Sequence, residues 1–286
     1  MVRELFGANL KMNPVYDCET SLGPVDFNSG SLFEKLLRGY VDEDVCGNEY
    51  REIVVFCPDL FLGYFNNDGR ENFHDILDNA DIKLGAQDVS EHESGAHTGE
   101  TSPLWLKELR VEYVLVGHSE VRERYERVSN CNYPMINSIF NKKIKCAQRN
   151  GLRTLYCIGE TQDEKNEGLT EKVLASQLGS GLRDIDPGLL CIAYEPRWAI
   201  GTGKIPTEDE IRDAHERIRF HMEKIYSPHH KKLQIVYGGS MNPDNVCDIM
   251  SIKRSDESPA VNGGLVGGAC LDAEEFSRIC NYRDRM

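Results

Sequence analysis

Residues 189–225 read LLCIAYEPRWAIGTGKIPTEDEIRDAHERIRFHMEKI. The stretch begins with an apolar run of strand length, which ends at Glu195 and opens into a loop. Thr207 and Glu210 then show the spacing of a capping box, in which both side chains accept backbone N–H groups at the start of a helix. The stretch therefore predicts one strand, one loop and one helix, which together are the repeating unit of α/β proteins.

This unit recurs along the chain. Eight short runs are apolar almost throughout, which is typical of strands buried on both faces of a parallel sheet. They are Glu4–Lys11, Glu52–Cys57, Lys83–Val89, Glu112–Val116, Thr154–Ile158, Leu189–Tyr194, Leu233–Tyr237 and Gly264–Val266. Helical periodicity appears at Ser31–Tyr40, Tyr133–Ala147, Thr170–Leu178, Thr207–Ile225 and Asp272–Tyr282. The alternation predicts an α/β fold, a (β/α)₈ barrel, with an open doubly wound sheet as the alternative.

The length agrees with one such barrel. A barrel of this kind needs about 250 residues, and the chain has 286. We therefore expect a single domain over residues 1–286, with insertions near residues 14–50 and 252–262. Residues 14–30 and 252–262 are rich in Gly, Ser, Pro or charged residues, which is typical of surface loops.

Composition excludes several functional classes. The chain has 33 Lys and Arg against 47 Asp and Glu, a net charge of −14, whereas non-specific binding to nucleic acid or anionic membranes needs a basic surface. No apolar run reaches the ~18–20 residues of a membrane span, and the first residues lack the apolar core of a signal peptide. The ten cysteines form no C-x-x-C pair, and no metal-ligand spacing is visible. We expect a cytoplasmic protein with reduced thiols, no metal, and neither nucleic acid nor a membrane as partner.

In a barrel, functional groups lie where the strands end. The first run ends with Asn9 and Lys11, which strand alternation would place on one face. The fourth ends at His118, where a following helix could hold the ring neutral, and the sixth ends at Glu195, a candidate general base. Taken singly, each also fits an ordinary solvated strand end, a hydrogen-bonded histidine or a loop acid.

Two further features suggest an anionic ligand that is enclosed during reaction. Residues 196–204 combine proline, tryptophan and glycines in a loop suited to a closing lid. Glycine pairs follow the seventh and eighth runs, at 238–239 and 267–268, where backbone N–H groups can approach a phosphate closely. Because the net charge would repel an anion, attraction is expected from Lys11, from backbone N–H groups and from Arg197.

Seven segments together resemble the triosephosphate isomerase family. They are GANLKMN, AQDVSEHESGAHTGETSP, VGHSE, CIGET, AYEPRWAIGTGK, YGGSMNP and GGLVGGA. The resemblance implies a TIM barrel and an aldose–ketose isomerase that interconverts dihydroxyacetone phosphate and D-glyceraldehyde 3-phosphate in glycolysis and gluconeogenesis. It also implies a homodimer that uses no cofactor, with a small phosphorylated sugar as substrate.

The resemblance also implies roles for single residues. Glu195 would be the base, His118 the neutral electrophile, and Lys11 and Asn9 would stabilise the enediolate and orient the substrate. The phosphate would be bound by backbone N–H groups of Gly201, Ser240, Gly267 and Gly268. Glu120 would hold the Lys11 ammonium, and Thr98 would insert into a partner subunit.

The chain departs from the family pattern beside the lid. Val121 and Arg127 replace an Arg and a Glu, so we expect the usual ion pair to be lost or rerouted through Arg122 and Glu126. Arg197 replaces an aliphatic residue at the start of the lid. At its end stands Pro206, which has no N–H; the family's bond between that N–H and the hydroxyl at Tyr237 therefore cannot form.

Two alternatives remain open from the sequence. One is a related isomerase of a four-carbon ketose phosphate, since the lid substitutions leave the substrate length undecided. The other is a catalytically silent phosphate-binding scaffold, which the joint presence of Asn9, Lys11, His118 and Glu195 disfavours.

Overall fold

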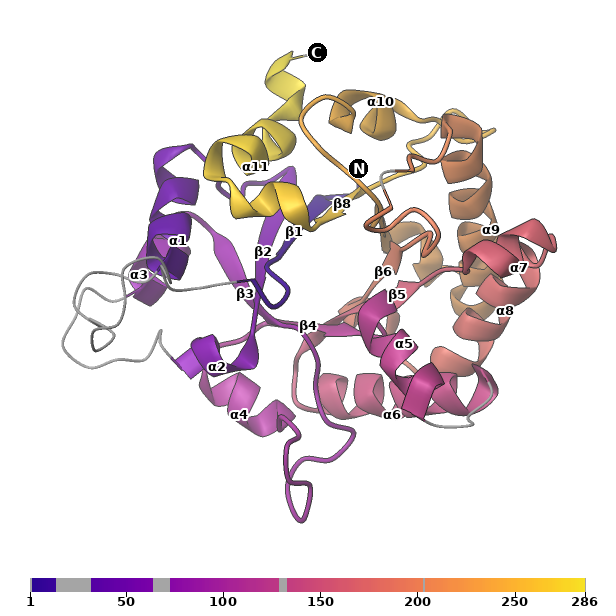
Figure 1. The fold of residues 1–286 in the computed structure, drawn as a ribbon, viewed down its shortest axis with the longest axis horizontal. Coiled ribbons are helices and arrows are strands. Elements are labelled where there is room, and N and C mark those ends of the chain that lie inside the picture. Colours follow the sequence, from indigo (N-terminus) through magenta and orange to yellow (C-terminus); the bar gives the residue numbers. More distant parts are fainter. Residues whose placement is uncertain (1, 14–31, 64–72, 129–132, 203, 286) are drawn as a thin grey trace.

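The computed structural model describes residues 2–13, 32–63, 73–128, 133–202 and 204–285. Residues 14–31 of the insertion expected near 14–50 lie outside the described residues, as does Gly203 of the lid. In Figure 1 the strands converge at the centre of the molecule, and the helices surround them.

The strands form a closed parallel barrel in the order β1 to β8, which confirms the predicted (β/α)₈ architecture. Closure rests on the pairing of β1 with β8, from Leu5 opposite Gly263 to Ala8 opposite Val266. An open doubly wound sheet, which would leave two free edges, is therefore excluded. The strands are β1 Glu4–Asn9, β2 Arg51–Cys57, β3 Ile82–Ala86, β4 Tyr113–Val116, β5 Arg153–Ile158, β6 Leu190–Tyr194, β7 Gln234–Tyr237 and β8 Gly263–Val266.

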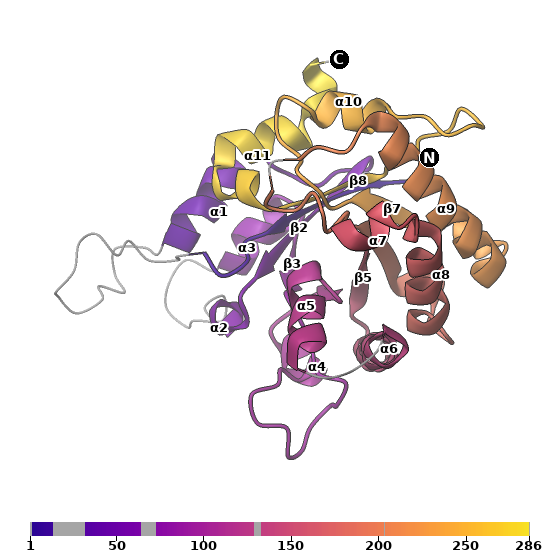
Figure 2. The same ribbon diagram turned by 45° about the vertical axis from the view of Figure 1, so that its right-hand side comes forward.

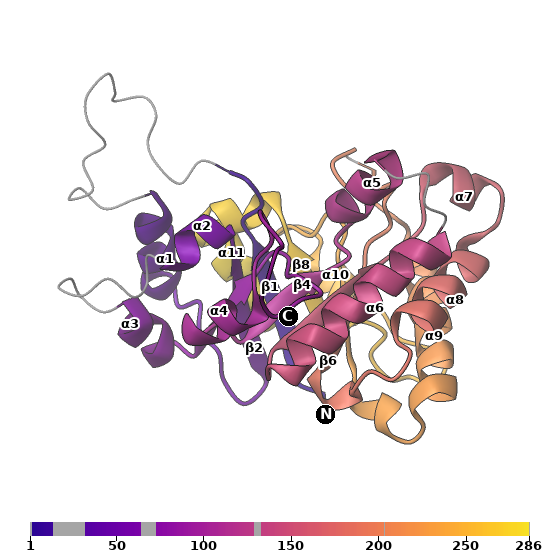
Figure 3. The same cartoon turned by 90° about the horizontal axis from the view of Figure 1, so that it is seen from below.

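The helices that periodicity predicts are all present. They are α1 Leu32–Asp42, α6 Tyr133–Arg149, α8 Thr170–Gly181, α9 Glu208–Tyr226 and α11 Ala273–Cys280, and the charged stretch after His118 forms α5 Ser119–Val128. The capping box that opens α9 is formed as predicted, with Thr207 and Glu210 each accepting an N–H. Figure 3 shows α6, α8 and α9 on one side of the barrel, where α8 contacts both neighbours.

Periodicity did not reveal five shorter helices, because none exceeds seven residues, or two turns. They are α2 Asp59–Leu62, α3 Phe73–Asn79, α4 Pro103–Glu108, α7 Gln162–Asn166 and α10 Val246–Ser251. Short 3₁₀ turns occupy η3 Pro187–Leu189, η4 His229–Lys232, η5 Gly268–Leu271 and η6 Tyr282–Arg285. Among the described residues, no helix is both long enough and apolar enough to span a membrane.

Strand alternation divides the core in two. Residues that point outward pack under the helices, and those that point inward fill the barrel. The inner cluster is Leu5, Val54, Phe56, Tyr113, Leu115, Leu155, Cys157, Cys191, Ala193, Val236 and Leu265. The interior of the barrel is therefore a packed core, so a ligand can bind only at the ends of the strands.

Phe56 is fully buried in this inner cluster, and two glycines make room for its ring. A Cβ atom on Gly85 of β3 would lie 2.4 Å from Phe56 Cδ1, and one on Gly7 of β1 would lie 2.9 Å from Phe56 Cε2. The ring thus fills the space that glycines on both neighbouring strands leave empty. A larger residue at either position would overpack the core.

We predict that Gly85→Ala lowers the free energy of unfolding by about 1–3 kcal/mol, because Phe56 must move out of its rotamer. The measurement is urea denaturation followed by circular dichroism. Gly179→Ala is the matched control, since a Cβ on this α8 residue would meet nothing within 4 Å and a helical alanine stabilises. Equal stability of the two variants would contradict this account of the packing.

Candidate active site

A cavity of about 380 Å³ opens at the carboxyl ends of the strands. All eight residues predicted to act in catalysis or substrate binding line it; they are Asn9, Lys11, His118, Glu195, Gly201, Ser240, Gly267 and Gly268. Three predicted residues lie elsewhere. Glu120 contacts Lys11, Tyr237 is buried in β7, and Thr98 is exposed on the loop between β3 and α4.

Glu195 follows β6 directly and is only 2% exposed. Its N–H donates to the carbonyl of Ile158 at 2.7 Å, so the strand pairing continues to the functional residue itself. Two glycines allow this placement, since a Cβ on Gly159 would lie 1.7 Å from the Glu195 carbonyl oxygen and one on Gly238 2.7 Å from its Cγ. Sequence reasoning gave these glycines no such role, although each directly follows a strand.

Both carboxylate oxygens of Glu195 have partners. The Ser119 N–H donates to Oε2 at 2.8 Å, and His118 Nε2 lies 3.1 Å from Oε1. The site thus holds a buried carboxylate beside an imidazole that is itself only 6% exposed. In this structure the two side chains are within hydrogen-bond distance of each other.

The proton on His118 can be assigned from its partners. The Glu120 N–H, in the first turn of α5, points at Nδ1 with a separation of 3.4 Å. With Nδ1 as an acceptor, Nε2 is the nitrogen that can donate, and it lies 3.1 Å from Glu195 Oε1 and 3.2 Å from Asn9 Nδ2. His118 is thereby a hydrogen-bond donor facing the cavity.

Lys11 reaches the cavity by a different route from the one expected. The strand ends at Asn9, and Lys11 follows in a turn with φ 50°, so the argument from strand alternation was wrong for this residue. Its N–H donates to Asn9 Oδ1 at 3.1 Å, and Gln87 Nε2 donates to its carbonyl at 3.0 Å. Gln87, which sequence reasoning did not single out, therefore fixes the backbone that carries the ammonium group.

The Lys11 ammonium donates to Glu120 Oε1 at 2.7 Å, in the contact predicted for this pair. Partial burial acts to raise the pKa of Glu120, but the hydrogen bond and the positive charge of Lys11 outweigh it. The net effect lowers the pKa of Glu120, which keeps the carboxylate ionised and the ammonium in place.

At the start of the lid, Trp198 contacts a second buried carboxylate, that of Glu160. Trp198 Nε1 donates to Glu160 Oε1 at 2.9 Å, and the Tyr194 hydroxyl donates to the same oxygen at 3.1 Å. Burial raises the pKa of Glu160, and these hydrogen bonds only partly offset it. The Lys165 ammonium lies over the Trp198 ring, 3.2 Å from the ring centroid, in a cation–π contact. Glu160 was not predicted from sequence, since only the fold brings it to Trp198.

The family model for triosephosphate isomerase matches residues 31–283. The chain belongs to the triosephosphate isomerase family. It is 42% identical over 214 residues to the triosephosphate isomerase of Thermodesulfovibrio yellowstonii, covering 74% of this chain and 81% of that relative. It is 36% identical over 286 residues to that of Endomicrobium trichonymphae, covering 99% of each. The crystal structure of triosephosphate isomerase from Bartonella henselae superposes with a TM-score of 0.77 at 30% identity, covering 99% of this chain and 100% of that one.

This triosephosphate isomerase family member is therefore an isomerase, and its fold is the expected TIM barrel. Its departures from the family pattern have structural consequences. A rerouted ion pair would have joined Arg122 to Glu126. Glu126 instead accepts two hydrogen bonds from Arg197. Arg122 instead donates to Asn137 Oδ1 at 2.8 Å, because its side chain points toward α6.

At the other end of the lid, the effect of Pro206 on the bonding of Tyr237 stays a prediction. The buried Tyr237 hydroxyl has no hydrogen-bond partner among the described residues. The pKa of Tyr237 is raised by burial and by the charge of Glu210. The phenol therefore stays neutral and can donate a hydrogen bond, but it has no acceptor among the described residues.

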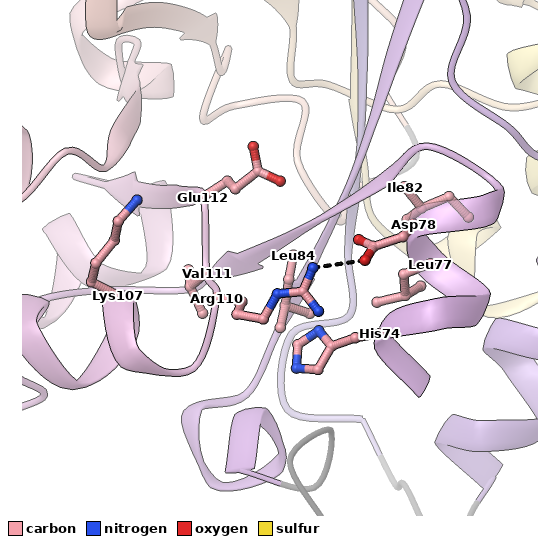
Figure 4. A pocket seen from close by; sticks show the side chains of 9 residues that line it. All are labelled: His74, Leu77, Asp78, Ile82, Leu84, Lys107, Arg110, Val111 and Glu112. Atoms are coloured by element: carbon pink, nitrogen blue, oxygen red, sulfur yellow. Dashed lines mark hydrogen bonds and ion pairs between the residues drawn. The ribbon is translucent and has the colours of Figure 1, made fainter. Parts of the chain in front are cut away.

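A second cavity, of about 260 Å³, lies at the opposite end of β3 and β4 (Figure 4). Its lining includes none of the predicted site residues. Arg110 crosses it to pair with Asp78 at 2.7 Å, which neutralises the charge that an anion would need. It therefore plays no part in the site described above.

We predict that Gly238→Ala lowers kcat by roughly a hundred-fold, because its Cβ would displace the Glu195 side chain and misplacements of about 1 Å cost that much. Steady-state kinetics on dihydroxyacetone phosphate measure the effect. Gly179→Ala, remote from the cavity, should keep the original kcat. A Gly238→Ala enzyme with unchanged kcat would show that Glu195 is not held by this contact.

Proposed function

We propose that this cavity interconverts dihydroxyacetone phosphate and D-glyceraldehyde 3-phosphate through an enediolate. The observation that carries the proposal is the pairing of a buried carboxylate with a buried imidazole, 3.1 Å apart, beside a lysine. Glu195 removes a proton from the carbon next to the carbonyl; the electron pair of that C–H bond forms a C=C bond, and the π pair of the C=O bond moves to the carbonyl oxygen. The carboxyl group then returns a proton to the neighbouring carbon, while the former carbonyl oxygen gains a proton and the adjacent hydroxyl loses one. One carbon is oxidised and its neighbour reduced within the substrate, so no external oxidant or reductant is needed.

Substrate binding would release the base. A substrate carbonyl that accepts the His118 Nε2 proton takes the place of Glu195 Oε1, which leaves that oxygen to face the carbon acid. His118 and Lys11 then both lie where the enediolate oxygen develops its charge, and such preorganised donors lower the barrier. Asn9 orients the substrate on the same side, with its Nδ2 3.2 Å from His118 Nε2.

The phosphate would lie at the far end of the cavity. Gly267 directly precedes the η5 turn and Gly268 begins it, while Gly201 and Ser240 come from the lid and from the loop after β7. Their backbone N–H groups can bind a phosphate without any arginine. Neither the hydride nor the redox chemistry of a cofactor is required by the proton transfer, so we propose that the enzyme uses none.

We further propose that the partner is a second copy of this chain. The loop between β3 and α4 projects from the barrel (Figures 1 and 2) and carries exposed Thr98. Three exposed apolar side chains belong to segments that are bonded to this loop or follow it, namely Met12 (95%) next to Lys11, Leu60 (85%) next to Asp59, and Trp105 (59%) on α4. An apolar surface next to a protruding, internally bonded loop fits a protein partner. Since Met12 adjoins Lys11, such an interface would also support the site.

A cytoplasmic location is proposed on the state of the thiols. The eight cysteines among the described residues are all free, and most are buried in the core. Burial raises the pKa of Cys191 to about 12, which keeps this thiol protonated and unreactive. A reducing compartment suits a chain with so many unpaired cysteines.

We predict that the protein catalyses deuterium exchange from D₂O into dihydroxyacetone phosphate, in a buffer with EDTA. Glu195→Gln should reduce the rate by about 10²–10⁴-fold, the usual contribution of a general base. Mass spectrometry of the sugar phosphate is the readout. Exchange only with a four-carbon ketose phosphate would favour the related isomerase, and exchange with neither would support a silent scaffold.

We predict that Trp105→Asp raises the dimer dissociation constant at least about ten-fold, because it places a charge in the apolar part of the interface. Sedimentation velocity across a concentration series measures this constant. Phe220→Asp on α9 is the matched control, since Phe220 is comparably exposed at 52% but belongs to another face. A similar weakening by both variants would place the interface elsewhere.

A further inference from the structure

One ion pair ties the start of the lid to α5. The two guanidinium nitrogens of Arg197 donate to the two carboxylate oxygens of Glu126, at 2.9 and 2.7 Å. Their side chains are only 11% and 25% exposed. A two-pronged pair that is this well shielded is stronger than a surface ion pair, and its planar geometry fixes the orientation of both groups.

Glu195 is bonded to the same helix as this pair. Its Oε2 accepts the N–H of Ser119, the first residue of α5, and Arg197 stands two residues after it in the chain. Glu126 lies seven residues after Ser119, which is about 10 Å along the helix. The segment from Glu195 to Arg197 is thus held to α5 at two points.

The helix is itself firmly placed. Arg122 donates to Asn137 on α6 and to the Cys157 carbonyl at the end of β5, at 2.8 and 3.2 Å. Its guanidinium also stacks over the Phe140 ring, 4.8 Å from the centroid. These contacts join α5 to the barrel, so a group bonded to α5 keeps its position relative to His118.

On the opposite side, the segment is bonded to the end of β5. The Arg197 N–H donates to the Glu160 carbonyl at 3.0 Å, and Pro196 restricts the backbone between base and lid. Arg197 is therefore bonded on two sides: its backbone N–H to the Glu160 carbonyl, and its side chain to Glu126 on α5. Since Arg197 is not among the residues lining the cavity, its charge acts on Glu126 rather than on a substrate.

We propose that Arg197 and Glu126 are a positioning pair, which holds the first residues of the lid against α5 and thereby orients Glu195 toward the reacting carbon. The proposal rests on the proposed function of Glu195 as the base. Because three of the four residues proposed to bind the phosphate, namely Ser240, Gly267 and Gly268, lie outside the lid, loss of the pair should lower kcat and leave KM nearly unchanged.

The test compares Arg197→Met, Glu126→Gln and the double variant. Each single variant should lower kcat roughly ten-fold, since modest misplacement of a base is costly, and the double variant should be no worse than either single one. KM and the inhibition constant of inorganic phosphate should stay within about two-fold of the original values. Exchanging the charges, as Arg197→Glu with Glu126→Arg, should restore part of kcat.

Glu52→Gln is the matched control, because it breaks a comparably shielded Arg–Glu pair with Arg153 at the opposite end of the barrel. It should lower stability in urea and leave kcat as it was. Arg197→Lys covers the case in which Arg197→Met fails to fold, since it keeps the charge but loses the second hydrogen bond; a partial fall in kcat is expected.

Three results would overturn the proposal: an unchanged kcat in the single variants, additive losses in the double variant, or a loss confined to KM. If the original enzyme catalyses no exchange at all, the proposed function fails instead. The two failures are therefore distinguishable in one set of assays.

Discussion

Pairing of β1 with β8 is the constraint on which the site depends. Closure brings the carboxyl ends of all eight strands to one rim, so residues as far apart as Asn9, His118 and Glu195 line one cavity. Closure also fixes how near neighbouring strand ends lie, and at Glu195 that distance leaves room only for glycine on either side. The precision of the site is thus a property of the closed sheet, and the loops add the lid and the phosphate contacts.

Charge at the site is balanced locally, against a net charge of −14 for the chain. Lys11 is paired with Glu120, and Glu275 adds a carboxylate to the same cavity. Arg197, expected to attract the substrate, is paired with Glu126 and does not line the cavity. In the proposed function, attraction of a phosphate therefore falls chiefly to backbone N–H groups, whose dipoles are not neutralised by the pairing of charged side chains.

The sequence was sufficient for the barrel and for eight of the residues that line the cavity, because apolar runs mark strands and function in this fold lies where strands end. It was not sufficient for the groups that support them. Gln87, Glu160 and Glu126 act on residues 38 to 76 positions away, and only the closed barrel brings these partners together. Lys11 lines the cavity, but strand alternation does not explain its place there, since alternation ceases once the strand has ended.

Lys11, which lines the cavity, has a left-handed backbone conformation with φ 50°, and this conformation lowers the stability of the fold. A non-glycine residue in this conformation costs on the order of 1 kcal/mol, which the bonds from Asn9 and Gln87 must offset. Glycine at position 11 would relieve the strain and remove the ammonium group. Selection for a sturdier fold and selection for turnover would therefore pull this residue in opposite directions.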